Sequence, residues 1–184
     1  MKADLHHYLR QGREALLWKL DDLGDYDVRR PLTPTGTNLL GLVKHVASVA
    51  AGYFGDCFGR PFPEPVPWFD EGAEANADLW AAEPRAEILG FWQRAWAHAD
   101  QTISDLDLDA TATVPWWPEE RRNPTLQLLL VHMTAETHRH AGHADILREL
   151  IDGRVGHRRD NDNIDPTDWV AHRERLEQVA QGFR

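Results

Sequence analysis

Apolar residues recur at intervals of three and four along four long segments of this chain, and nowhere do they alternate as they would in a strand. Each segment opens on a residue that favours a helix start and ends near one that favours a stop. The predicted helices cover residues 4–24, 37–59, 84–107 and 125–153, and a shorter one follows Asp165-Pro166 and ends before Gly182. This pattern predicts an all-α fold, a four-helix bundle with an additional short C-terminal helix.

The connections between these helices are long and unequal. Four prolines alternate with other residues from Pro61 to Pro67, which excludes a helix there, and Trp116-Trp117-Pro118 marks an irregular segment before the last long helix. Such connections leave room for a non-sequential order of helices. A chain of 184 residues has the size of one domain, and it buries roughly 70% of its unfolded surface on folding. We therefore expect a single domain over 1–184 that needs neither a disulfide nor a structural metal.

Charge and cysteine content exclude several classes of protein. Acidic residues outnumber basic ones by 30 to 20, and a formal net charge of -10 without a basic run disfavours nucleic acid as a partner. Cys57 is the single cysteine, which excludes an internal disulfide framework and fits a reducing cytoplasm. The N-terminal segment is broken by charge every few residues and predicts neither a signal peptide nor a membrane span. We expect a soluble, cytoplasmic protein.

A row of polar side chains follows one face of the last long helix. Its members are His132, Glu136, His140 and His143. They stand at steps of four, four and three, and the same face continues into Leu128 and Leu147, which predicts that the row points toward the core. Because an unpaired buried carboxylate or imidazole is costly, the row needs a partner from another helix.

That partner is predicted on the second helix. His45 lies three residues after Leu42 and four before Val49, on an apolar face. Residues four apart on a helix have Cβ atoms about 5–6 Å apart. One divalent ion can therefore bind Glu136 and His140 together, while His45 supplies a third ligand from the facing helix. Three protein ligands leave a coordination position open, which is typical of a catalytic site. Nitrogen and carboxylate ligands suit zinc, nickel, iron or manganese, and affinity alone does not choose among them.

The same spacing has a simpler interpretation. Glutamate and histidine four residues apart often form a solvent-exposed pair worth a few tenths of a kcal/mol, and a chain with 10 histidines offers coincidences. His138 falls off the polar row, and His6 and His7 are adjacent, so they cannot both face the core. We expect these three histidines at the surface.

The tryptophans divide into two groups by position. Those in predicted helices are core candidates: Trp18, Trp80, Trp92 and Trp96. Those in predicted loops are Trp68, Trp116 and Trp117. The loop tryptophans either line the mouth of the metal pocket, where they would suit an apolar electrophile, or pack beneath their own loops, or form a contact between the subunits of a homodimer.

The segments NLLGLVKHVASVAAGYF and HMTAETHRHAGHADILREL together resemble the DinB-like superfamily of metal-binding four-helix bundles, and most closely its mycothiol-associated branch. The resemblance extends from the first helix to Gly153. It implies that His45, Glu136 and His140 bind a divalent metal, and the sequence HAGH from His140 matches the family's histidine, small residue, glycine and polar residue. Many members have histidine in place of Glu136. The glutamate form is similar to the mycothiol-dependent maleylpyruvate isomerase and related thiol transferases.

This resemblance implies a zinc-like ion that activates a thiol cofactor. We expect zinc, with nickel, iron or manganese as alternatives, and mycothiol as co-substrate. The isomerase carries a further domain after its bundle, whereas about thirty residues follow Gly153 here, which favours transfer of the thiol to an electrophilic small molecule. His132 and His143 flank the ligand pair and are candidate catalytic residues, as a general base or as groups that orient the ligands. The alternative for both is a core histidine satisfied by a backbone carbonyl. Cys57 lies over three helical turns after His45, too far to bind the same ion.

Three classes of function stay open at this stage. The first is a metal-dependent thiol S-transferase. The second is a metal-dependent hydrolase that uses the same three ligands. The third is a non-catalytic bundle that binds metal, or nothing, and acts through protein contacts. Dependence on an added thiol separates the first two classes, and metal content separates both from the third.

Overall fold

The computed structural model describes residues 1–162 and 164–184, and its regular structure is helical. Within these ranges there is no strand, and two isolated β-bridges are the sole extended pairings. The predicted all-α fold with a short C-terminal helix is confirmed. The α-helices are α1 Lys2–Leu17, α2 Asp25–Arg29, α3 Leu39–Phe54, α4 Arg85–Asp105, α5 Leu126–Asp152 and α6 Trp169–Gln181. Short 3₁₀-helices, labelled η, are η1 Trp18–Leu20, η2 Asp56–Phe58, η3 Pro67–Phe69, η4 Ala77–Leu79 and η5 Glu119–Arg121.

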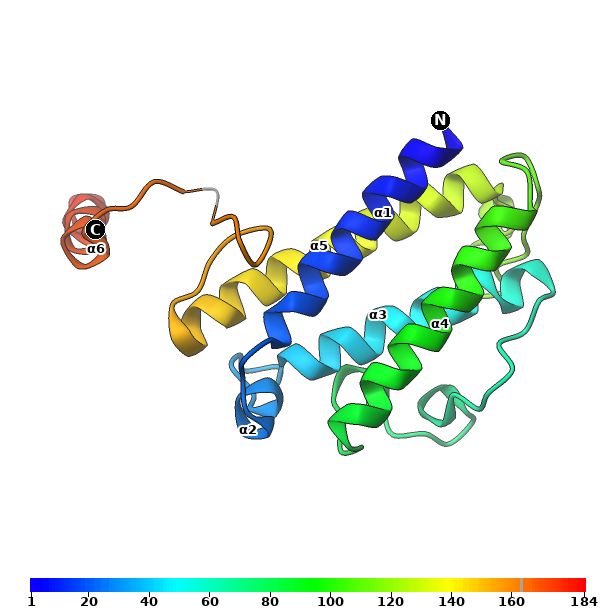
Figure 1. Ribbon diagram of the computed structural model, residues 1–184, viewed down its shortest axis with the longest axis horizontal. Coiled ribbons are helices and arrows are strands. Elements are labelled where there is room, and N and C mark those ends of the chain that lie inside the picture. Colours follow the sequence, from blue (N-terminus) through cyan, green and yellow to red (C-terminus); the bar gives the residue numbers. More distant parts are fainter. Residues whose placement is uncertain (163) are drawn as a thin grey trace.

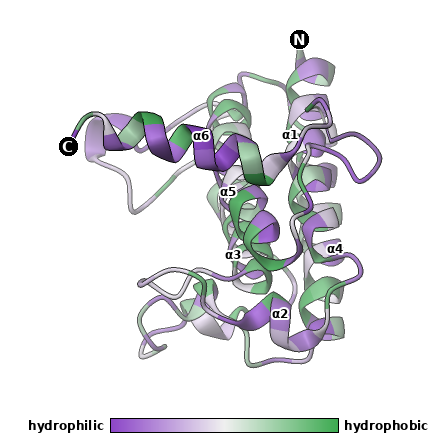
Figure 2. Ribbon diagram, turned by 90° about the vertical axis from the view of Figure 1, so that its left-hand side faces the viewer, coloured by the Kyte–Doolittle hydropathy of each residue, from purple (hydrophilic) through white to green (hydrophobic). Residues whose placement is uncertain are grey.

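The four long helices pack in a non-sequential order (Figure 1). The main pairings join α1 with α5 and α3 with α4, and α3 also contacts α5. The order around the bundle is therefore α1, α5, α3, α4, and α4 meets α1 again through the ion pair of Arg13 with Asp100. Figure 1 shows α6 standing away from the bundle, on the side that faces the viewer in Figure 2, and none of its residues is buried. No helix in the described part of the chain has both the length and the apolar character needed to cross a membrane.

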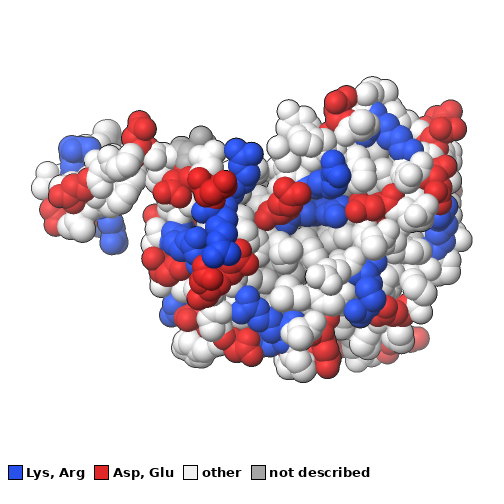
Figure 3. Space-filling model, in the orientation of Figure 1, with Lys and Arg blue, Asp and Glu red and all other residues white. Residues whose placement is uncertain are grey.

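Charged side chains of both signs alternate over the face of the molecule drawn in Figure 3. Lys and Arg lie among Asp and Glu there, so this face offers no extended positive surface. That distribution agrees with the formal net charge of -10.

The helix α3 forms the centre of the core. Asn38 caps it by accepting a hydrogen bond from the backbone N–H of Gly41, and the helix ends before Gly55. Every residue of α3 is buried except three, and these three share one face: His45, Val49 and Gly52. The half-buried face of α3 is therefore the face that carries His45.

Four predicted boundaries are corrected by the structure. The first helix ends at Leu17 and passes into η1, so it does not continue to residue 24, and α2 was not predicted. The second helix is capped by Asn38, the neighbour of the predicted Thr37, and ends at Phe54. The last helix begins after Asp168, whose side chain accepts two backbone hydrogen bonds, and not at Pro166. At each start, several residues able to cap a helix stand close together in the sequence, and tertiary packing selects one.

Two predictions about single side chains also need correction. Trp80 is 40% exposed because it follows η4 in a loop, whereas Trp18, Trp92 and Trp96 are buried as predicted. Of the three histidines expected at the surface, His7 is exposed. His6 is half-buried and bonds to Asp100 at 2.8 Å, while His138 donates to the carbonyl oxygen of Tyr8 at 3.0 Å. Both lie where α1 meets a neighbouring helix.

A fully buried arginine ties α5 to the segment after α1. Arg148 is 0% exposed, and its guanidinium donates hydrogen bonds of 2.8 Å to the carbonyl oxygens of Lys19 and Asp21. It also pairs with Asp152 one turn further on. Lys19 is equally buried and pairs with Asp145 on α5. Because carbonyl groups at the end of α1 lack partners within that helix, these contacts close this end of the bundle.

We expect Arg148→Met to lower the free energy of unfolding by about 3 kcal/mol, because two carbonyl groups lose a charged donor while the side-chain volume is nearly kept. Urea unfolding followed by circular dichroism measures the change. Arg139→Met is the control, since Arg139 is exposed on the same helix, and it should alter stability by less than about 0.5 kcal/mol. A similarly small effect of Arg148→Met would contradict the closing role of this arginine.

Candidate metal centre

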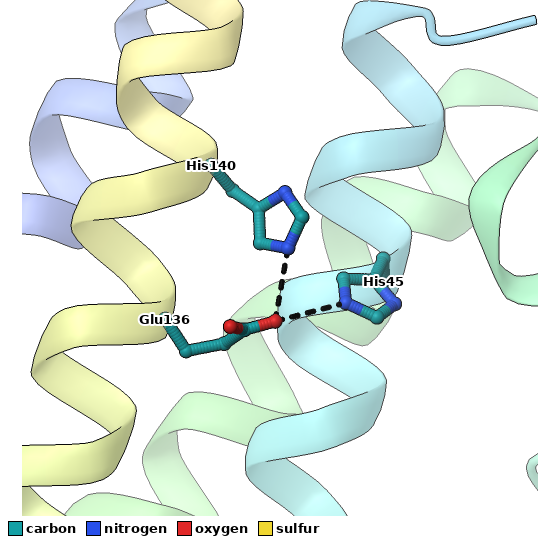
Figure 4. A group of neighbouring side chains, drawn as sticks. All are labelled: His45, Glu136 and His140. Carbon is teal, nitrogen blue, oxygen red and sulfur yellow. Dashed lines mark hydrogen bonds and ion pairs between the residues drawn. The ribbon is translucent and has the colours of Figure 1, made fainter. Parts of the chain in front are cut away.

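Two helices bring the three predicted ligands together. His45 comes from α3, Glu136 and His140 come from adjacent turns of α5, and the three side chains point toward one another (Figure 4). Nε2 of His45 lies 3.4 Å and Nε2 of His140 lies 2.9 Å from the same oxygen, Oε1 of Glu136. One ligand atom from each residue lies within 4.8 Å of the other two.

The polar row of α5 lies beside the buried face of that helix and not on it. Each of its four members stands one position before a buried residue: Met133, Thr137, Ala141 and Ala144. The row is accordingly half-buried. Of the two leucines predicted to continue the row into the core, Leu147 is buried and Leu128 is 42% exposed. The predicted inward direction was therefore wrong by about one residue around the helix, and this offset leaves the site open on one side.

The geometry fits a small divalent ion. Bonds of about 2.0–2.1 Å at tetrahedral angles place ligand atoms roughly 3.3 Å apart, and the separations of 2.9 and 3.4 Å around Glu136 are close to that spacing. Two imidazole nitrogens and one carboxylate oxygen form a donor set suited to zinc and to neighbouring transition metals. These three residues could therefore hold a metal with a coordination position left open.

Burial and the neighbouring charges set the protonation of the three ligands. Burial acts to raise the pKa of Glu136, but His140 and His45 outweigh it and lower that pKa, so the carboxylate stays ionised. Burial, followed by the positive charge of His45, lowers the pKa of His140, which favours the neutral ring. Burial acts in the same direction on His45, but hydrogen bonds to Asp78 and Glu136 outweigh it and raise the pKa of His45. Glu136 is thus held as an anion and His140 as a neutral ring, whereas the two carboxylates beside His45 favour the protonated form of that ring.

The two flanking histidines have different surroundings. Nδ1 of His143 lies 3.3 Å from Nδ1 of His140, so His143 bonds to the ring nitrogen of His140 that faces away from Glu136. His132 lies on the other side, where it lines a cavity. Burial lowers the pKa of His132. The structure therefore places His143 against the ring of His140, and His132 at the cavity beside the candidate ligands.

A cavity of about 690 Å³ opens next to His45 and Glu136. The residues of α3 that are not fully buried, His45, Val49 and Gly52, all line it, together with side chains from α5 and from several loops. Its acidic members are Asp56, Asp78 and Glu136, and its lining contains no Lys or Arg. The cavity therefore connects the ligands to solvent through apolar and acidic walls.

Tyr53 gathers aromatic side chains into one of those walls. Its hydroxyl accepts hydrogen bonds from the indole N–H groups of Trp116 and Trp117 at 3.2 and 2.9 Å. The rings of Tyr53 and Trp117 have centroids 5.0 and 5.1 Å from that of His132. Trp116 lines the cavity, Trp117 packs behind it, and Trp68 lies elsewhere, with its N–H donating to Ser48. Of the predicted alternatives for the loop tryptophans, Trp116 therefore lines the pocket, whereas Trp117 and Trp68 pack against neighbouring side chains.

One half-buried acidic residue of the site was missed by the sequence analysis. Asp78 belongs to η4 and its Oδ2 lies 2.5 Å from Nδ1 of His45. It stands in a connecting segment without helical periodicity, so no pattern singles it out. The available signal lay on α3 instead, where Lys44, a charged residue next to His45 in an otherwise apolar helix, has to find partners from another segment.

The helical bundle and its His, Glu and His cluster between two helices fit the DinB-like class. Residues 4–153, from α1 to the end of α5, match the family model described as mycothiol-S-transferase, and the chain belongs to this family. The match includes all three ligand residues. The comparison with individually curated proteins gives no match.

We expect the purified protein to bind close to one divalent ion per chain and to lose it on the substitution His140→Ala, because two remaining ligands hold a metal weakly. Elemental analysis of protein prepared without a histidine tag measures the content. His138→Ala on the same helix is the control and should keep the ion. A wild-type protein that contains no metal and takes up none on titration would exclude the site.

Removing the metal should leave the helical circular dichroism signal intact and lower Tm by about 5–10 °C, since a bound ion stabilises the folded state by about 2–3 kcal/mol at a hundredfold excess over Kd. The core described above is complete without an ion. Thermal unfolding with and without a chelator makes the comparison. Complete unfolding in chelator at room temperature would instead show the metal to be structural.

Proposed function

We propose that this protein is a metal-dependent enzyme that transfers mycothiol to an electrophilic small molecule. The observation that carries the proposal is the His45, Glu136 and His140 cluster at the edge of a cavity, in a chain of the mycothiol-S-transferase family. Zinc is the metal we expect, with nickel, iron or manganese as alternatives. A reaction that consumes a reduced thiol fits a cytoplasmic location. The homodimer stays a prediction.

The ligand residues set the charge of the site. When bound, a divalent ion lowers the pKa of a coordinating thiol and so supplies a thiolate at neutral pH. Glu136 is the single anionic ligand, so the site keeps a net charge of about +1, which favours an anionic sulfur over a neutral one. His143 bonds to Nδ1 of His140 and holds that ring in place.

We propose that His132 is the base that accepts the proton of the thiol. Among the described residues, neither of its ring nitrogens has a hydrogen-bond partner, and the ring lines the cavity one turn from Glu136. Because burial lowers its pKa, the ring is neutral at neutral pH and can accept a proton. The sulfur then forms a bond to the electrophilic carbon, whose leaving group departs with the bonding electron pair, and His132 returns the proton to the leaving group or to water.

The walls of the cavity favour an uncharged thiol and an apolar electrophile. Mycothiol carries no carboxylate, whereas glutathione carries two, and the three acidic residues of the lining would repel such groups. Trp116 and Phe69 supply apolar surface for the electrophile. The thiol of the chain itself is not available, because Cys57 is 5% exposed and burial raises its pKa to about 11.

We expect metal-loaded protein to conjugate mycothiol to a chlorinated nitroaromatic and to give no product with glutathione. Glu136→Gln should abolish conjugation and weaken metal retention, since it removes the charge of the ligand and keeps its size. His132→Gln should keep the metal and lower turnover on the order of 10² to 10⁴-fold, the usual effect of losing a general base. Product formation and metal content are measured on the same samples.

The outcome of this experiment separates the open classes. Turnover that requires mycothiol supports the transferase. Cleavage of esters or amides without any thiol would assign a hydrolase at the same three ligands. Metal-loaded protein that is inactive with mycothiol across a broad panel of electrophiles, and inactive as a hydrolase, would leave a non-catalytic metal-binding bundle.

A further inference from the structure

The segment that contains η4 lies directly on α3, one turn before His45. The carbonyl oxygen of Leu79 approaches Gly41 so closely that a Cβ atom at Gly41 would stand 1.9 Å from it. Asn38, the cap of α3, donates a hydrogen bond of 3.3 Å from Nδ2 to the same oxygen. Because a side chain at residue 41 would exclude this contact, the glycine fixes the distance between η4 and α3.

The buried cation that precedes His45 holds the same segment. Nζ of Lys44 donates to the carbonyl oxygens of Ala77 and Trp80 at 2.9 and 3.0 Å and to the carboxylate of Glu83 at 2.8 Å. Lys44 is 2% exposed. An ammonium group buried to this extent is tolerated when its donors are satisfied. The backbone on both sides of Asp78 and Leu79 is thus bound to α3.

These contacts place Asp78 on the far side of the His45 ring from the other ligands. The side chains of His45 and Asp78 are 17% and 14% exposed, and Nδ1 and Oδ2 are 2.5 Å apart. An ionised carboxylate can only accept, so Nδ1 carries the proton of this bond. Nε2, the nitrogen that faces Glu136, is then the one that can offer a lone pair to a metal.

We propose that Asp78 is a positioning residue of the metal centre and that Asn38, Gly41 and Lys44 act through it. By binding η4 to α3 they hold Asp78 against His45, and Asp78 holds the imidazole in the tautomer and orientation that metal binding needs. The inference rests on the proposed metal site. Carboxylates that accept from a ligating histidine raise its basicity, and losing them costs about 10–100-fold in metal affinity.

The first test measures the dissociation constant of Zn²⁺ by competition with a chromophoric chelator, for the wild type, Asp78→Ala and Asp78→Asn. We expect Asp78→Ala to weaken binding 10–100-fold. Asp78→Asn should fall between Asp78→Ala and the wild type, because the amide oxygen still accepts from Nδ1 but carries no charge. Asp70→Asn, in an exposed part of the same connection, is the matched control and should bind as the wild type does.

The second test displaces Asp78 indirectly, by a substitution on α3. Gly41→Ala displaces Leu79 and should weaken Zn²⁺ binding to an extent similar to Asp78→Ala, although residue 41 touches none of the ligands. The double variant should show little further loss, since both changes remove the same contact. Lys44→Met serves the same purpose if Gly41→Ala fails to fold, as judged by circular dichroism. The absorption spectrum of the Co²⁺-loaded protein reports the changed ligand field at His45 independently of activity.

The outcomes are distinguishable from failure of the proposed function. If the wild type binds no metal, the metal site itself is excluded. If the wild type binds Zn²⁺ and folded Asp78→Ala binds it equally well with an unchanged Co²⁺ spectrum, the positioning role is wrong. A loss of turnover without a change in metal affinity would also overturn it and would assign Asp78 to the substrate, since this residue also lines the cavity.

Discussion

The burial of α3 is the constraint on which the rest of this structure depends. A helix that is buried on nearly all sides cannot leave its polar side chains to water, so each must be satisfied by another segment. Lys44 binds the backbone around η4, Ser48 accepts from Trp68, and Tyr53 accepts from Trp116 and Trp117. The connections that the sequence shows as irregular are therefore ordered by polar groups of α3.

The same constraint explains why the candidate site stands where it does. His45 is the polar residue of α3 on the face that is left half-buried, and it finds partners in two directions, Asp78 from η4 and Glu136 from α5. Two acidic partners on one imidazole are more than a structural histidine requires. The arrangement fits the proposed role of His45 as a metal ligand, in which Asp78 holds Nδ1 and Nε2 faces the second candidate ligand, Glu136.

Much of this fold could be predicted from the sequence, because helical periodicity and capping residues are local signals. The pairing of His45 with the residues of α5 could also be predicted, since both stand beside apolar stripes that must meet in one core.

Leu128 shows the limit of such reasoning. Periodicity fixes which residues share a face, but the direction of that face depends on neighbouring helices. Asp78 could not be predicted, because its place follows from tertiary contacts at Gly41 and Lys44, which no local sequence pattern indicates.

The polar groups of the bundle fall into two sets with different physical consequences. At the end of α1, Arg148 and Lys19 have acceptors close by on all sides and are fully buried, so their exchange with solvent requires unfolding. Around His45, Glu136 and His132 the groups are half-buried and face a cavity of about 690 Å³. A structural metal site would close its coordination with a fourth protein ligand, whereas among the described residues this cluster offers three candidate ligands and opens toward that cavity. Contacts outside the candidate site thus stabilise the fold, and the proposed exchange of protons, metal and substrate at that site does not require the bundle to unfold.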